Sequence, residues 1–256
     1  VIQTIENNRT ELVSLKSSLD EDYLTRAKAF AYVIEKNPNI IESVTELQNL
    51  ATLLDVDELH VSDSEGLIAY SSVPKYVGLD FHNGEQMRGF LPILESDDPD
   101  EYVIQDAQPN TAEGKIMKYV GVARKDKKGL VQVGLEPTRL LEAQQRNTYS
   151  YIFSRFPTNE GEQLFAINKT TNELIASTND LDDKEASYYT YDNLKDCQSG
   201  TFKDIGNKTE NFFVTREYDN ILIGATVPKD ILYKNRSRDL LFIGAYLIEI
   251  EIGIVV

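Results

Sequence analysis

The chain has 256 residues, of which 41% are hydrophobic and 27% are charged, and its net charge at pH 7 is −16. This composition is typical of a globular protein, and the length predicts two domains of modest size. The negative charge argues against nucleic-acid binding and against docking on an anionic membrane surface, because both need clustered lysine and arginine.

Cysteine and histidine are scarce. Cys197 is the one cysteine, and His60 and His82 are the two histidines. A lone thiol makes no disulfide within the chain, and so few thiols and imidazoles do not indicate a metal centre. We therefore predict no metal ion and no cofactor.

The first 36 residues contain no proline and no glycine, and their apolar residues recur at steps of three and four. That spacing predicts one helix, about 54 Å long if it is continuous. The sequence Asn37-Pro38-Asn39 ends it, and a second helix is expected from about Glu42 to Leu54. Because the chain starts at Val1, we expect it to be part of a longer protein.

After residue 55 the hydrophobic period changes to two, which predicts strands. A hairpin comes first, followed by a polar, glycine-containing region and then further strands; Pro137 begins another helix. The predicted strands are 59–61, 67–71, 102–106, 116–124 and 129–136.

The second half repeats this plan, with strands expected at 164–168, 174–177, 200–205, 211–217 and 221–227. The tripeptide Leu174–Ala176 repeats Leu67–Ala69 letter for letter, each time in the return strand of a hairpin. Gly224 precedes Pro228 much as Gly134 precedes Pro137. Two matched landmarks in the same order indicate an internal repeat.

Residues 240–256 are apolar except for Glu249 and Glu251, as at the start of a membrane span. A span needs about 20 residues, and an acidic residue inside a bilayer is costly. Two interpretations stay open, the beginning of a transmembrane segment and a helix end.

Enzyme signatures are absent from the sequence. It contains no Gly-x-Gly-x-x-Gly, no Gly-x-Ser-x-Gly, no His-Glu-x-x-His and no complete phosphate loop. We name no catalytic residue and predict that this chain is not itself an enzyme. The acidic runs at 97–101 and 180–185 lack the spacing of a calcium loop and are expected to be solvated loops.

Several short motifs together resemble the double Cache family of extracytoplasmic sensor domains. They are the long N-terminal helix, Val61-Ser62-Asp63, Ser71–Pro74, Gly78–Phe81, Tyr119–Val122 and Val131–Pro137. The resemblance covers roughly residues 1–240. It implies an α+β fold of two tandem PAS-like modules with antiparallel sheets joined by the long helix. The expected domains are a helical lead-in at 1–55, a membrane-distal module at 56–145, a membrane-proximal module at 146–240 and the possible span at 241–256.

The same resemblance implies a function. Such domains lie outside the cell on histidine kinases, diguanylate cyclases, phosphatases and chemoreceptors, and they bind small molecules in the distal module. We therefore expect a small-molecule ligand, a membrane tether in the full-length protein and possible homodimerisation through the N-terminal helix. The alternative is a structural or dimerisation module without a ligand.

The predicted pocket lies in the first module, whose span from 72 to 102 is longer and richer in aromatic residues than the span from 178 to 200. An arginine and two tyrosines over small residues are suited to a carboxylate-bearing ligand. The candidate ligand-binding residues are Arg88, Phe90, Tyr102, Asp106, Tyr119 and Gly121. The alternative is that the aromatic residues belong to the core and Arg88 to the surface.

A subset of the family binds amino acids through an arginine two residues before a Trp-Tyr pair. This chain has Arg88-Gly89-Phe90-Leu91 at the comparable place and no tryptophan. We therefore expect a ligand other than a standard amino acid.

Overall fold

The computed structural model describes residues 1–234, and the chain divides into two compact units. The first module is Thr10–Ala143, and the second module consists of Val1–Arg9 together with the residues from Gln144 onward. Helix α1 (Ile2–Lys36) contributes residues to both modules, and helix α5 (Thr138–Arg146) contains the boundary between them.

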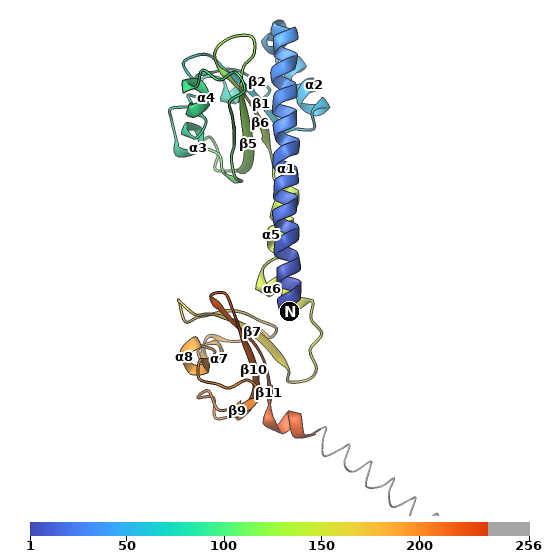
Figure 1. The fold of residues 1–256 in the computed structure, drawn as a ribbon, viewed down its shortest axis with the longest axis vertical. Helices are drawn as coiled ribbons and strands as arrows, with labels where there is room; N and C mark the ends of the chain where they lie inside the picture. Colours follow the sequence, from blue (N-terminus) through green and yellow to red (C-terminus); the bar gives the residue numbers. More distant parts are fainter. Residues whose placement is uncertain (235–256) are drawn as a thin grey trace, which may run out of the picture. The chain divides into compact units, whose positions relative to one another are not determined.

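The first module contains one sheet with helices on both of its faces (Figure 1). All strand pairs are antiparallel, in the order β2-β1-β6-β5-β3, with β4 added beside β5. Helices α1 and α2 lie on one face, and the segment containing α3 and α4 covers the other.

The elements of the first module after α1 are η1 (Pro38–Glu42), α2 (Val44–Leu53), β1 (Glu58–Ser62), β2 (Ile68–Ser71), η2 (Pro74–Tyr76), α3 (Glu85–Arg88), α4 (Leu91–Glu95), β3 (Tyr102–Ile104), β4 (Gln108–Pro109), β5 (Ile116–Ala123) and β6 (Leu130–Leu135).

The helical face of this sheet is apolar because α1 turns one stripe toward it. Tyr23, Ala27, Phe30 and Ile34 follow helical spacing and are buried against alternate residues of the strands. The stripe ends where the chain reaches Pro38, which starts η1. Ser43 then caps α2 by accepting a hydrogen bond from the backbone N–H of Glu46.

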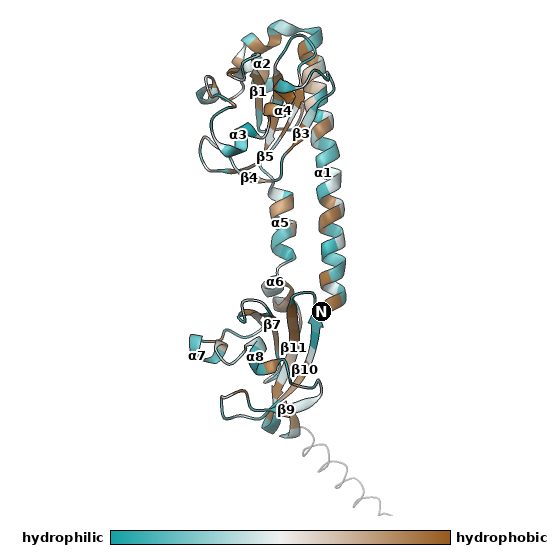
Figure 2. Ribbon diagram, turned by 60° about the vertical axis from the view of Figure 1, so that its left-hand side comes forward, coloured by the Kyte–Doolittle hydropathy of each residue, from teal (hydrophilic) through white to brown (hydrophobic). Residues whose placement is uncertain are grey.

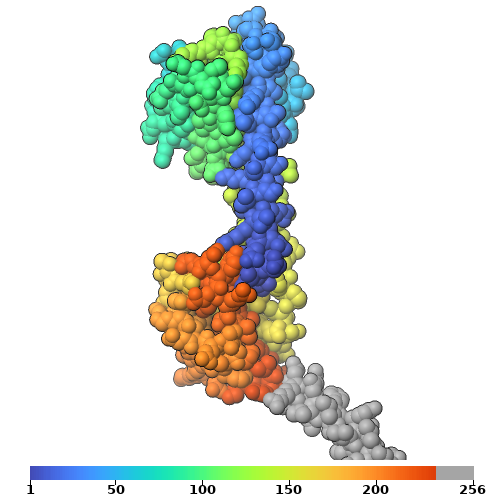
Figure 3. Space-filling view, viewed as in Figure 1, coloured from blue at the N-terminus to red at the C-terminus, as the bar shows by residue number. Residues whose placement is uncertain are grey.

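The opposite face of the same sheet is also buried. Phe81, Phe90 and Ile93 of the covering segment pack there against Met117 and Leu130. Strands β1, β5 and β6 are therefore enclosed on both faces, and Figure 2 shows β5 as mainly hydrophobic. The covering segment forms a closed surface on the side of the first module seen in Figure 3.

The second module has the same strand plan, in the antiparallel order β8-β7-β11-β10-β9. One face packs on α6 and the start of α1, and the other packs under α8. Its elements after α5 are α6 (Tyr149–Ser154), β7 (Gln163–Asn168), β8 (Leu174–Ser177), α7 (Asp183–Ala186), α8 (Tyr191–Leu194), β9 (Thr201–Lys203), β10 (Asn211–Tyr218) and β11 (Ile221–Pro228).

The hydrogen-bond register allows the two modules to be compared residue by residue. His60 on β1 lies opposite Ser71 on β2, and Phe165 on β7 lies opposite Ser177 on β8. The register shifts shortly after this pair in both hairpins, between Val61 and Ser62 in β1 and between Ala166 and Ile167 in β7. The two hairpins therefore have the same irregular geometry. His60 and Phe165 therefore occupy equivalent positions.

The repeated tripeptide of the sequence is out of step with this equivalence. Ser62 pairs with Ile68, and Ile167 pairs with Leu174, so Ile68 corresponds to Leu174 rather than to Ile175. The landmark identifies the correct pair of strands, but it misplaces their residues by one position. In a strand, a shift of one residue exchanges the two faces of the sheet.

The predicted fold class, two antiparallel α+β modules with a long N-terminal helix, is confirmed by these elements. The possible span at 241–256 lies outside the described residues. Among the helices of residues 1–234, none is both long and apolar enough to cross a bilayer.

Candidate functional site

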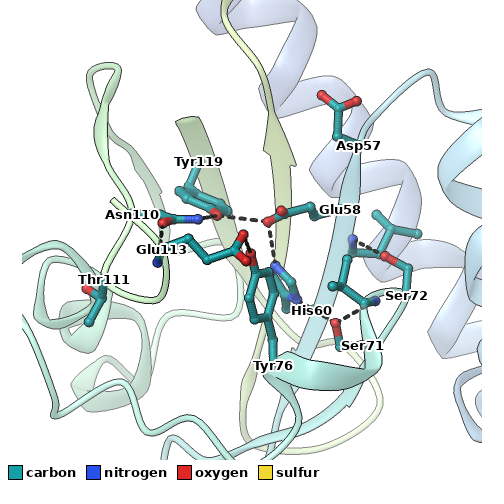
Figure 4. Close-up of polar contacts among 12 residues, drawn as sticks. Asp57, Glu58, His60, Ser71, Ser72, Tyr76, Asn110, Thr111, Glu113 and Tyr119 are labelled. Carbon is teal, nitrogen blue, oxygen red and sulfur yellow. Dashed lines mark hydrogen bonds and ion pairs between the residues drawn. The ribbon is translucent and has the colours of Figure 1, made fainter. Parts of the chain in front are cut away.

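A chain of buried polar side chains crosses the covered face of the first module (Figure 4). The hydroxyl of Tyr119 donates to Oε2 of Glu58 at 2.8 Å, and Nε2 of His60 lies 3.2 Å from the same oxygen. An ionised carboxylate can only accept, so Nε2 of His60 carries a proton. Oγ of Ser71 lies 2.9 Å from Nδ1 of His60 at the far end of the chain.

The alternation of strand β1 places these groups on the covered face. Leu59 and Val61 point into the apolar cluster under α1, so Glu58 and His60 point to the other side. Gly134 on β6 lies opposite both Glu58 and Tyr119. A Cβ atom on Gly134 would stand 2.5 Å from Cε1 of Tyr119, so the ring can cross the sheet only because residue 134 is a glycine.

Two more polar groups extend the chain toward the edge of the covering segment. Nδ2 of Asn110 donates to the hydroxyl of Tyr119 at 3.3 Å, and the hydroxyl of Tyr76 donates to Glu113 at 2.6 Å. The ring of Tyr76 meets the His60 ring edge-on, with 5.6 Å between centroids. The ring of His60 is thus fixed by its polar partners and by an aromatic neighbour.

Burial and hydrogen bonding act in opposite directions on the Glu58 carboxyl. Burial raises its pKa, but the hydrogen bonds and electrostatic interactions with His60, Tyr119 and Lys115 together outweigh this effect, so the net pKa lies below the usual range. Burial also raises the pKa of Tyr119 and of Tyr76, and nearby carboxylates raise both further. Both phenols are therefore neutral donors at physiological pH.

A small cavity of about 20 Å³ adjoins this chain of polar groups, which is room for roughly one water molecule. Its walls contain no aspartate, glutamate, lysine or arginine among the described residues. Anything larger than water can enter only if the covering segment moves. The cavity is lined by His60, Ile68, Tyr76, Leu79, Gln86, Met87, Asn110, Thr111, Ala112, Tyr119 and Gln132.

Gln132 differs from the other two carboxamides of the cavity wall. Gln86 and Asn110 each use their amide in hydrogen bonds within the protein. Gln132 is only 3% exposed, and its Nε2 has no hydrogen-bond partner among residues 1–234. A buried amide without a partner costs free energy, about 1–3 kcal/mol, so this group is suited to receive one from a ligand.

The equivalent place in the second module is filled by aromatic rings. Gln132 lies opposite His60, and Gly224 lies opposite Phe165, so the glutamine is replaced by a glycine. The Phe165 ring covers that glycine, since a Cβ atom on Gly224 would stand 2.2 Å from Cζ of Phe165. Phe213, the counterpart of Tyr119, meets Phe165 edge-on at 6.1 Å. The second module therefore has core where the first has a polar cavity.

The structure brings three of the predicted site residues to the covered face. Tyr119 lines the cavity. Phe90 is fully buried and packs over Gly121, where a Cβ atom would stand 2.7 Å from Cδ1 of the ring. Phe90 and Gly121 thus belong to the core beside the cavity and are not among its lining residues.

The other three predicted residues lie elsewhere. Arg88 is exposed at the end of α3 and does not line the cavity. Tyr102 is 46% exposed, and its ring lies 5.6 Å from Nζ of Lys28, on the α1 side of the sheet. Asp106 is exposed and forms a 2.6 Å ion pair with Lys16 of α1. Tyr102 lies on the α1 side because side chains alternate along β3: its neighbour Val103 pairs with Gly121 and faces the covered side.

Sequence reasoning missed Glu58, His60, Tyr76 and Gln132. Leu59 and Val61 indicate the first strand, and Glu58 and His60, which alternate with them, have the pattern of residues that face solvent. The available signal was the length of the covering segment, because a long cover over a sheet buries the polar positions of its strands.

The described residues contain no group of three or more histidine, cysteine, aspartate or glutamate side chains that is arranged to hold a metal ion. Glu58 and His60 form a pair only.

No protein-family model and no curated protein sequence matches the chain. Solved structures do. The ligand-binding domain of the Campylobacter jejuni chemoreceptor Tlp3, in complex with 4-methylisoleucine, is 14% identical, with a TM-score of 0.41 over 91% of this chain and 90% of that one. The ligand-binding domain of Mlp24 with asparagine is 13% identical, with a TM-score of 0.40 over 91% and 95%.

A third similar structure is the extracellular domain of rpHK1S-Z16, assigned as a histidine kinase. It is 13% identical, with a TM-score of 0.39 over 90% of this chain and 95% of that one. These structures are ligand-binding or extracellular domains, and each alignment covers about nine tenths of this chain.

Proposed function

We propose that the chain is the extracytoplasmic small-molecule-sensing part of a bacterial membrane receptor, with its ligand site in the first, membrane-distal module. The observation that carries the proposal is the difference between the two modules. One sheet plan supports a buried polar cavity beside His60 and Gln132 in the first module and packed aromatic rings at Phe165 and Gly224 in the second.

A polar cavity of this kind is costly for a purely structural module. Replacing Gln132 by the glycine found at the equivalent place of the second module would remove a buried amide that has no partner among the described residues. The second module shows that this sheet folds with such residues. The polar groups of the first module are therefore best explained by recognition of a ligand.

The ligand would bind by moving the covering segment away from the sheet. The cavity of about 20 Å³ is too small for a metabolite, and its polar groups mostly hydrogen-bond to one another. A ligand that binds only the opened cover shifts the population toward that state. The output domain and the membrane tether belong to the full-length receptor in this proposal.

The test is a thermal-shift screen over amino acids, carboxylates, amines and uncharged heterocycles, followed by calorimetry on each hit. A double variant, His60→Phe with Gln132→Gly, introduces the pair found at Phe165 and Gly224 in the second module. We expect it to fold and to bind no hit. A hit that still binds this variant would place the site elsewhere, and a screen without any hit would support the structural or dimerisation alternative.

A further inference from the structure

The wall of the cavity in the first module contains no aspartate, glutamate, lysine or arginine among the described residues. A ligand with a carboxylate would find no lysine or arginine there, and a ligand with an ammonium group would find no aspartate or glutamate. Burying an ion without a partner is strongly unfavourable. Arg88, the one nearby cation expected to serve, is exposed and outside the cavity.

Glu58 does not alter this balance. Its carboxylate stands behind the wall, where Tyr119 and His60 already donate to the same oxygen. It fixes the rings that face the cavity and leaves those rings as the groups that a ligand meets. Its role is to position them.

Among the described residues of the wall, Gln132 is the carboxamide whose nitrogen makes no hydrogen bond. Its carboxamide has a donor and an acceptor side by side, and its Nε2 is buried without a partner among the described residues. A carboxamide of this kind pairs with two adjacent atoms of a ligand, one accepting and one donating, as glutamine and asparagine do with adenine. Beside the polar His60, Gln86, Asn110 and Thr111, the wall has aromatic and aliphatic side chains from Tyr76, Tyr119, Ile68, Leu79 and Met87.

We infer that the ligand is an uncharged planar heterocycle of the nucleobase type, bound through paired hydrogen bonds to Gln132, with its faces against aromatic and aliphatic side chains. This inference rests on the proposed function and specifies the ligand class. An amide-like edge satisfies Gln132, and flat apolar faces suit the rings. A ligand without a net charge suits a wall that has no lysine, arginine, aspartate or glutamate among the described residues.

The chain offers a matched control in the second module. Gln163 is also a buried glutamine on the covered face of its sheet, but both polar atoms of its amide have a hydrogen-bond partner. Its Nε2 donates to Ser177 at 2.8 Å, and its Oε1 accepts from the hydroxyl of Tyr189 at 3.1 Å. Gln132→Leu and Gln163→Leu are therefore the same substitution, made at an unpartnered amide and at a partnered one.

The experiment measures thermal shifts with adenine, hypoxanthine and uracil at millimolar concentration, beside leucine, succinate and putrescine as charged probes. We expect at least one nucleobase to stabilise the protein. Gln132→Leu should weaken that binding at least about tenfold without lowering the melting temperature of the unliganded protein, because it removes an unpaired buried amide. Gln163→Leu should lower the melting temperature and leave the affinity unchanged.

Three results would overturn the inference, and they separate it from the proposed function. If only charged probes bind, the sensing function stands and the ligand class is wrong. If a nucleobase binds but its affinity is unaffected by Gln132→Leu, the assigned contact is wrong. If no probe of either class binds, both the ligand class and the sensing function lose their support.

Discussion

The hydroxyl of Tyr119 donates a 2.8 Å hydrogen bond to Glu58 across the backbone of Gly134, and this bond joins two strands that are not neighbours. Strand β6 lies between β1 and β5, so the side chains form a bridge above it. A change in the position of either side chain therefore affects all three strands, β1, β6 and β5. Four predictions follow from this bridge and from the ion pair on the opposite face.

Tyr119→Phe should destabilise the first module by about 1.5–3 kcal/mol, because it removes a hydrogen bond to a charged acceptor. The matched control is Tyr189→Phe in the second module, which removes a bond to the neutral amide of Gln163. That loss should be only about 0.5–1.5 kcal/mol. Urea unfolding of both variants measures the difference, and equal losses would contradict an ionised Glu58.

The bridge should also make stability depend on pH through Glu58. Its folded pKa is lowered, so the ionised carboxylate contributes stability that is present above the ordinary glutamate pKa and is lost as the pH falls through the folded value. Glu58→Gln should therefore be less stable than the unmodified protein at pH 7, and the gap should close below about pH 4.

The measurement is the free energy of unfolding between pH 7 and pH 3. Glu95→Gln removes the same charge from an exposed position and serves as the control. A gap that stays constant across this range would show that the substitution acts through packing instead of ionisation.

Gly134→Ala should destabilise the first module by roughly 1–3 kcal/mol, because the new methyl group would stand 2.5 Å from the ring of Tyr119. Combining it with Tyr119→Val removes the clash, so the double variant should lose less than the sum of the single variants. Additive losses in this double-mutant cycle would indicate that Gly134 is needed for some other reason.

The α1 side of the same sheet contains a buried cation. Lys118 is fully buried, its Nζ lies 2.6 Å from Asp20 of α1, and it also donates to the backbone oxygen of Gln105 at 2.8 Å. Asp20→Ala leaves the ammonium group without its charged partner and should cost about 3 kcal/mol or more.

Lys118→Met removes the fully buried charge and leaves only Asp20, whose side chain is 25% exposed, so it should cost less than Asp20→Ala. Chemical denaturation of the two variants tests this asymmetry. Equal losses from the two substitutions would mean that the ammonium group is more solvated than its position indicates.

The sequence by itself determined the architecture of this protein. Apolar residues such as Tyr23, Ala27 and Phe30 at helical spacing predict α1, and alternation in the strands predicts the sheets, because both patterns are local consequences of backbone geometry. The repeat of the strand plan also needs only local signals, and it was enough to predict two similar modules.

Only the tertiary structure decided which residues form the cavity. Glu58, Gln132 and Tyr119 are brought together because β1 pairs with β6 and β6 pairs with β5. The paired residues are 70 to 76 positions apart in the sequence in the first case and 7 to 17 in the second. The side of the sheet that each residue faces depends on the register, and a shift of one residue reverses it. Arg88 and Tyr102 had the right chemistry in the right segment, but the end of α3 and the alternation of β3 direct them away from the cavity. Burial of both faces of the sheet, which no single strand reveals, is what turned polar residues such as His60 into a candidate site.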